Sequence, residues 1–334
     1  MAKVRENPKV AAPWVNLGDS LAQVLRYTAN AKYYDFAELA YQRALKLDPR
    51  SIDAMSGMAW VTGGRHLFDQ SISWANRALT IDPSHASSHG FVGDAALELG
   101  DYVKAFSEYH KMMDLRPDLS SWSRGSYLLW LTGNRTKAMR LIEKAIKAES
   151  VETNDRAWCR AKLALLLFDD GAYAPAANAL KPALAADPEN VHACLAAGRI
   201  AAARRDLPAA EQYYEKVLAV RPNHEALVAL GDLEAVAGRK EEAEEYYRKV
   251  EVLHRRRGAR DVDDDLLLAK FYADHDRNLG EALRLIEPRL LTRNVLEADT
   301  VAWVLFKNGD LTHAREVMRR ALRQRTPLAE FHYH

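Results

Sequence analysis

The sequence has few residues of the kinds that cross-link or interrupt a chain. Its 334 residues include only two cysteines, 16 glycines and 12 prolines. Two thiols do not make a disulfide framework, and the surroundings of Cys159 and Cys194 show no metal-ligand pairing, so we expect both to be buried free thiols. Glycine and proline fall at the ends of periodic segments, which leaves long uninterrupted stretches for helices.

The chain also lacks an excess of one charge and any long apolar run. Its formal net charge is +1, so no overall field favours nucleic acid or an anionic membrane. No segment approaches the roughly 20 apolar residues of a membrane span, and residues 1–10 have no apolar core of a secretory signal. We therefore predict a cytoplasmic protein with no nucleic-acid partner and no membrane insertion. A periplasmic location would follow if a signal peptide had been removed.

Motifs of catalysis and cofactor binding are absent from the sequence. We find no GxxxxGK phosphate loop, no GxGxxG after a strand, no HExxH and no GxSxG. His85 and His89 have the i, i+4 spacing of two zinc ligands, but no third ligand is near them. They are better explained as surface or packing histidines. The sequence predicts a chain that is not an enzyme and holds neither a cofactor nor a metal.

A repeated phrase is the strongest positive signal. ALKLDP at 44–49 returns as ALTIDP at 78–83, with variants at 112–117, 183–188 and 217–222. The prolines that end the first three phrases are 34 residues apart, and apolar residues recur at i, i+3, i+4 and i+7 between them. A period of 34 with paired helices indicates a solenoid of helix–turn–helix repeats. Each proline ends a second helix, because it lacks an N–H and clashes with a preceding carbonyl.

In this register the chain resembles the tetratricopeptide repeat (TPR) family over nearly its whole length. That family has small residues at repeat position 8, on the first helix, and at position 20, on the second. Position 8 holds Gly18, Ala59, Gly93, Ser126, Ala164, Gly198, Gly231, Ala269 and Ala302. Position 20 holds Ala37, Ser71, Ala105, Ala138, Ala176, Ala210, Ala243, Ala282 and Ala314. The resemblance implies an all-α fold, a right-handed α-solenoid or superhelix of about nine repeats.

Small residues at these two positions let the helices of a pair approach closely, while larger neighbours interdigitate around the gap. Bulky position 24 is occupied by tyrosine in four repeats, where the rings are expected to fill the space between adjacent repeats. These tyrosines are Tyr41, Tyr109, Tyr214 and Tyr247.

Residues 1–334 are predicted to form a single solenoid with two interruptions. Repeat four ends in Ser150 where a proline is expected, and the link at 253–265 is lengthened. Flexible joints are therefore expected near 150–156 and 255–264. They divide the solenoid into 8–150 (repeats 1–4), 151–256 (repeats 5–7) and 257–327 (repeats 8–9), with 328–334 as the start of a further helix.

The resemblance also implies where a ligand would bind. In the TPR family, the first helices line a concave groove, and ligands contact positions 2, 5, 9, 12 and 13. The groove residues carried over to this sequence are Asp19, Trp60, Asp94, Tyr127, Trp130, Phe168, Arg199, Asp232, Lys270, Trp303 and Phe306. Trp, Tyr and Arg dominate binding hot spots, but a place in the core is an equally good explanation for Trp60, Trp130 and Trp303. Position 5 lacks lysine and position 9 lacks asparagine, which argues against a chaperone-tail clamp and against an asparagine ladder.

These observations predict a non-catalytic protein–protein interaction scaffold or adaptor that binds a peptide segment or a partner protein in the groove. A second hypothesis is a recruiting TPR domain from a longer multidomain enzyme or from a secretion or assembly component. It is motivated by Pro8, which stands where a preceding repeat would end. A third is self-association into a homo-oligomer through the terminal repeats.

Overall fold

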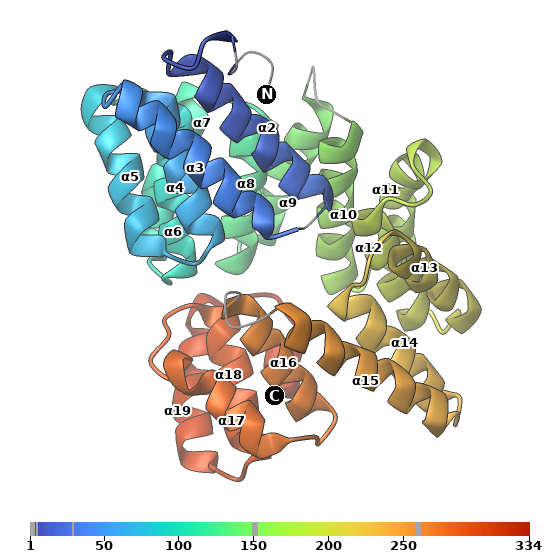
Figure 1. The fold of residues 1–334 in the computed structure, drawn as a ribbon. Coiled ribbons are helices and arrows are strands. Elements are labelled where there is room, and N and C mark those ends of the chain that lie inside the picture. Colours follow the sequence, from blue (N-terminus) through green and yellow to red (C-terminus); the bar gives the residue numbers. More distant parts are fainter. Residues whose placement is uncertain (1–3, 5, 29, 149–152, 258–261) are drawn as a thin grey trace. The chain divides into compact units, whose positions relative to one another are not determined.

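The computed structural model describes residues 4, 6–28, 30–148, 153–257 and 262–334 (Figure 1). These residues form α-helices and short 3₁₀ helices, and no strand occurs among them. The chain divides into two compact units, an N-terminal unit that ends at Pro117 and a C-terminal unit that begins at Asp118. Parts of the two predicted joints, residues 150–152 and 258–261, lie outside the described residues. The division into three runs of repeats therefore stays a prediction.

The N-terminal unit contains three helix pairs among its described residues, each made of two consecutive helices packed side by side. The second helix of each of the first two pairs also packs against the first helix of the pair that follows. The pairs are α2 (Ala12–Thr28) with α3 (Lys32–Leu47), α4 (Ile52–Gly64) with α5 (Phe68–Ile81), and α6 (Ala86–Glu98) with α7 (Tyr102–Leu115).

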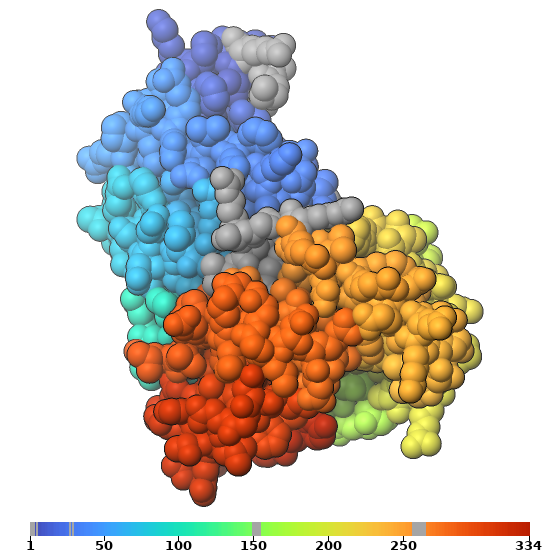
Figure 2. All heavy atoms as spheres, turned by 60° about the horizontal axis from the view of Figure 1, so that its bottom comes forward, coloured from blue at the N-terminus to red at the C-terminus, as the bar shows by residue number. Residues whose placement is uncertain are grey.

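The C-terminal unit contains six further pairs among its described residues. They are α8 (Leu119–Leu131) with α9 (Arg135–Lys147), α10 (Thr153–Asp169) with α11 (Tyr173–Ala186), α12 (Val191–Ala203) with α13 (Leu207–Val220), α14 (His224–Val236) with α15 (Lys240–Arg257), α16 (Val262–Asp274) with α17 (Leu279–Ile286), and α18 (Val295–Lys307) with α19 (Leu311–Ala321). The 3₁₀ turns Glu287–Arg289 and Leu322–Gln324 follow α17 and α19. Figure 2 shows that side chains fill the gaps between the ribbons of 262–334, coloured orange to red. The predicted all-α repeat fold is confirmed.

The repeated prolines end helices as the sequence predicts. The second helices α3, α5, α7, α11 and α13 each end two residues before a proline, at Leu47, Ile81, Leu115, Ala186 and Val220. Residues 328–334, predicted to begin a further helix, contain the four-residue helix α20 (Glu330–Tyr333).

The small residues of positions 8 and 20 meet across each helix pair. All eighteen are buried. Where one of them is a serine, its hydroxyl donates a hydrogen bond to the backbone carbonyl of the opposite small residue: Ser71 to Ala59 at 2.8 Å and Ser126 to Ala138 at 2.7 Å. This close approach is the one that the pattern predicts.

Glycine at position 8 has a further purpose, which is to make room for the tyrosine at position 24. A Cβ atom on Gly93 would lie 2.4 Å from Cε1 of Tyr109, and one on Gly231 would lie 2.4 Å from Cε1 of Tyr247. Each ring lies against the glycine of its own pair. The ring of Tyr247 also contacts Phe271 of the next pair, at 5.6 Å between centroids, as expected for a residue between adjacent repeats. The ring of Tyr41 additionally reaches Gly57 of the next pair.

Candidate functional site

The predicted groove residues are divided between the two units. Asp19, Trp60 and Asp94 belong to the N-terminal unit, and the other eight belong to the C-terminal unit. Trp60 is half-buried, packs against the cluster around Val15 and lies 5.4 Å from the ring of Tyr34, measured between centroids.

The three predicted aspartates share a contact that sequence reasoning missed. Each accepts a hydrogen bond from the position-24 tyrosine of its own pair. The bonds run from Tyr41 to Asp19 (2.8 Å), from Tyr109 to Asp94 (2.8 Å) and from Tyr247 to Asp232 (2.9 Å). Burial raises the pKa of the Asp19 carboxyl, and the hydrogen bond from Tyr41 opposes that rise. The signal was present in the sequence, because tyrosine at position 24 accompanies aspartate at position 9 in three repeats.

In the C-terminal unit, the predicted aromatic residues form local contacts with one another and with cations. Tyr127 stacks on Trp130 at 5.8 Å between centroids. The guanidinium group of exposed Arg199 lies 5.2 Å from the centre of the Phe168 ring. The negative face of the aromatic ring attracts the guanidinium cation and helps to hold it there.

The residues 326–334, hereafter the 326–334 segment, lie against several first helices of the same unit. Thr326 Oγ1 donates a hydrogen bond of 2.6 Å to the carbonyl oxygen of Leu131, 195 residues earlier in the chain. A carboxylate oxygen of Glu330 lies 2.6 Å from Nζ of Lys270. Both carboxylate oxygens of Asp299 lie 3.0 Å from Nδ1 of His334. A backbone carbonyl of α8 and side chains of α16 and α18 thus hold one short stretch of the chain.

The electrostatics of these contacts favour the ion pair between Lys270 and Glu330. Burial alone would lower the pKa of Lys270, but the carboxylates of Glu330 and Asp274 raise it above its ordinary value. Burial alone would raise the pKa of Glu330, and Lys270 more than reverses that effect. Both groups are therefore charged at neutral pH. In the neighbouring contact, burial raises the pKa of Asp299, and His334 opposes that rise.

Trp303, one of the predicted groove residues, is buried beneath this segment. Only 7% of its surface is exposed. Its indole N–H donates a hydrogen bond of 2.8 Å to Asp274. The His334 ring stacks on one side at 4.4 Å between centroids, and Phe306, which is 46% exposed, stacks at 5.4 Å. Predicted residues Lys270, Trp303 and Phe306 are therefore brought together, with Asp274 between the first two.

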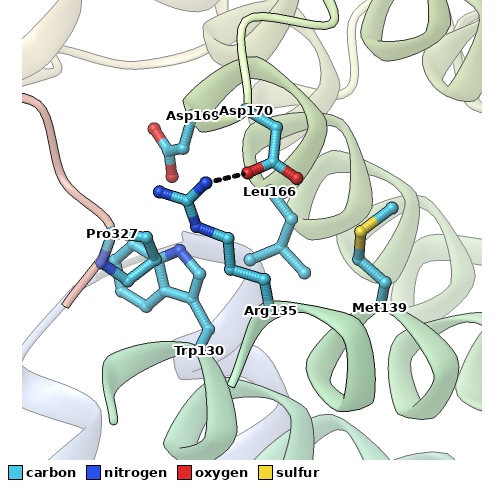
Figure 3. Close-up of a pocket in the computed structure, with 7 residues that line it drawn as sticks. All are labelled: Trp130, Arg135, Met139, Leu166, Asp169, Asp170 and Pro327. Carbon is cyan, nitrogen blue, oxygen red and sulfur yellow. Dashed lines mark ion pairs between the residues drawn. The ribbon is translucent and has the colours of Figure 1, made fainter. Parts of the chain in front are cut away.

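A small pocket lies where the 326–334 segment passes α8 and α10 (Figure 3). Its lining includes the ring of Trp130 and, opposite it, Pro327. Arg135 forms an ion pair of 2.7 Å with Asp170 there. Burial raises the pKa of neighbouring Asp169 to about 6, and the guanidinium groups of Arg199 and Arg135 offset this only in part.

The raised pKa of Asp169 predicts a stability that depends on pH. Its folded-state pKa lies above the unfolded value of 3.8, so ionisation costs stability, and the cost grows between about pH 4 and pH 6. We expect Asp169→Asn to raise the free energy of unfolding by about 1 kcal/mol at pH 7.5, after allowance for solvent screening, and to have little effect at pH 4. Urea denaturation at the two pH values measures the difference.

The control is Asp170→Asn, which removes the ion pair with Arg135. This variant should be no more stable than the wild type at pH 7.5. An equal gain from both substitutions would mean that the burial of Asp169 is not the cause.

His89 and the two cysteines belong to the packed interior. His89 Nδ1 lies 2.6 Å from a carboxylate oxygen of Glu108 and its Nε2 lies 3.0 Å from the carbonyl of Pro83, which makes it a packing histidine. Cys159 and Cys194 are buried. Within the described ranges, no group of three or more His, Cys, Asp or Glu side chains is placed to hold a metal ion.

Comparison with known proteins agrees with the repeat architecture. The family model described as "Tetratricopeptide repeat" matches residues 161–219 and 195–260. The other helix pairs carry the same small residues at positions 8 and 20, and α3, α5 and α7 end before the same prolines. The family model thus identifies tetratricopeptide repeats in residues 161–260.

Solved structures of other TPR-like chains share the fold at low sequence identity. The Cut9 and Hcn1 hetero-tetramer of the APC/C has a chain that is 14% identical, with a TM-score of 0.61, and the match covers 97% of this chain and 58% of that one. Pseudomonas aeruginosa PilF is 19% identical, with a TM-score of 0.51, over 60% of this chain and 91% of PilF. The human IFIT1 dimer with PPP-AAAA is 15% identical, with a TM-score of 0.51, over 91% and 84% of the two chains. At these identities the likeness concerns the fold alone.

Among the helices that the structure describes, none is both long enough and apolar enough to cross a bilayer.

Proposed function

We propose that this TPR protein is a non-catalytic scaffold that binds a peptide segment of a partner protein on the first helices of its repeats. The proposal rests on the contacts between the 326–334 segment and the first helices of the same unit. Three first helices contact this one segment: α8 accepts a hydrogen bond at a backbone carbonyl, α16 forms an ion pair and α18 supplies a stacked ring. A surface that holds one peptide segment by these means has the chemistry to hold another.

Most of the binding surface exists before a partner arrives. Lys270 is held by Asp274 of its own helix at 2.9 Å, and the indole of Trp303 donates a hydrogen bond to the same carboxylate. Because these side chains are already ordered, little conformational entropy is lost on the scaffold when a peptide binds. We propose a protein partner and no nucleic acid, since the formal net charge of +1 supplies no excess of cations for phosphates.

The proposal is tested by selecting peptides from a random phage-displayed library on the full chain. We expect the selected peptides to lose most of their affinity for Lys270→Glu, since the substitution inverts the charge that holds a carboxylate. Arg140→Glu is the matched control, because it inverts an exposed charge on the second helix α9. Selected peptides should bind it as they bind the wild type. Failure to select any peptide, or equal loss in both variants, would contradict the proposal.

A further inference from the structure

The 326–334 segment contacts the positions of the repeat at which a TPR ligand was expected. Lys270 and Trp303 occupy position 9, Asp299 occupies position 5, and Trp130 occupies position 12. Each of them either touches the segment or lines the pocket beside Pro327. The chain therefore covers part of its own first-helix surface with its own residues.

Two polar contacts anchor the segment, and their spacing defines a pattern. Glu330 pairs with Lys270, and His334, four residues later, contacts Asp299. The side chains of His334 and Asp299 are only 2% and 4% exposed, so this second contact is shielded from solvent. Phe331 lies between the two anchors in sequence and is 3% exposed. The surface thus accepts a carboxylate, a buried aromatic ring and an imidazole in the order Glu-Phe-x-x-His.

The connection between the segment and the last helix pair allows a competing peptide to displace the segment. It follows a 3₁₀ turn, Leu322–Gln324, and Arg325 at φ 54 turns the backbone out of the last helix pair. Its own helix α20 has four residues, too few to be stable alone. Its position therefore depends on contacts with the first helices, which a competing peptide can replace.

We propose that residues 326–334 occupy the site of a partner peptide that presents a glutamate and, four residues later, a histidine. The inference rests on the proposed function and adds the chemistry of the partner. The intramolecular segment competes with the partner, and its high effective concentration weakens the partner's apparent affinity without any change in the surface. A partner with both anchors displaces the segment, and a peptide that lacks them does not.

The experiment uses the full chain and a labelled synthetic peptide with the sequence of residues 325–334, RTPLAEFHYH. Fluorescence anisotropy measures its binding to the wild type and to Glu330→Gln/His334→Ala, in which the internal competitor is weakened. We expect the double variant to bind the peptide at least about tenfold more tightly than the wild type does. Adding Lys270→Met to the double variant should abolish that gain. A peptide that carries glutamine in place of Glu330 and alanine in place of His334 should also show no gain.

The matched control is Glu316→Gln/His332→Ala, which makes the same chemical changes at two exposed positions. It should bind the peptide as weakly as the wild type. Because the double variant leaves Asp299 without its histidine, Glu330→Gln alone is measured as well. This single variant keeps the buried contact and should show a smaller gain of the same sign. Circular dichroism checks that each variant is folded.

Equal peptide affinities for the wild type and both released variants would overturn the inference. So would a gain that survives Lys270→Met. In either case, phage-selected peptides that still need Lys270 would leave the proposed function standing. A wild-type dimer in sedimentation equilibrium that requires both Glu330 and Lys270 would make a second copy of the chain the occupant and would overturn the assignment to a partner.

Discussion

Gly93→Leu is expected to lower the free energy of unfolding of the N-terminal unit by about 3 kcal/mol, at the upper end of the usual cost of overpacking. The first atom of the new side chain would lie 2.4 Å from Cε1 of Tyr109. The ring of Tyr109 must therefore move, and its 2.8 Å hydrogen bond to Asp94 would be lost with it. Urea denaturation measures the loss, and hydrogen exchange in α6 and α7 locates it.

Gly280→Leu provides the matched control. Gly280 also lies in a helix, but no atom lies within 4 Å of a Cβ built on it. The substitution should be neutral or slightly stabilising, because leucine is the better helix former. The Gly93→Leu/Tyr109→Ala double variant should lose less stability than the two single losses combined, since both substitutions act on one contact. Strict additivity would show that the clash with Tyr109 is not the cause.

The backbone architecture was predictable because it depends on residues that recur with the period. Proline at five helix ends and small residues at positions 8 and 20 are local requirements of one helix pair, so they repeat wherever the pair does. The close contact of Ser71 with Ala59 shows that requirement directly. A single sequence is enough to detect such a signal.

The candidate site was less predictable, because its contacts are not periodic. The hydrogen bond from Thr326 to Leu131 joins residues 195 positions apart, and nothing in the repeat register implies it. The pattern places Lys270 and Trp303 on first helices, but it does not predict that residues near 330 cover them. Irregular segments escape periodic analysis, although they are often the segments that determine what a repeat surface is able to bind.

Tyrosine at position 24 illustrates an intermediate case. The sequence indicated a bulky residue there and glycine at position 8, but it left their contact partners open. The structure puts the ring of Tyr247 against Gly231 and its hydroxyl group on Asp232. Three positions of one repeat are thus coupled, and Asp232 also contacts His275 of the following pair at 2.8 Å. The predicted groove aspartates therefore also support the packing of the repeats.

Trp303→Ala is the second substitution with a large expected effect, and it decides between the two explanations that the sequence left open for this ring. If Trp303 faced the groove, its removal would leave folding nearly intact. Its 7% exposure and its hydrogen bond to Asp274 instead predict a loss of about 4 kcal/mol in the C-terminal unit. His334 would lose the ring on which it stacks, so hydrogen exchange in residues 326–334 should accelerate.

Phe306→Ala is the control for this prediction, because the ring lies on the same helix and stacks on Trp303 but is 46% exposed. We expect it to cost about 1 kcal/mol, in proportion to the smaller apolar area that it buries. Denaturant unfolding of the two variants, read by circular dichroism, gives the comparison. If Trp303→Ala were as mild as Phe306→Ala, the ring would contribute little to the core, and its main contribution would be to the binding surface. If the loss is several times larger, Trp303 supports the 326–334 segment from beneath, and a displacing peptide must replace the contact that His334 makes with it.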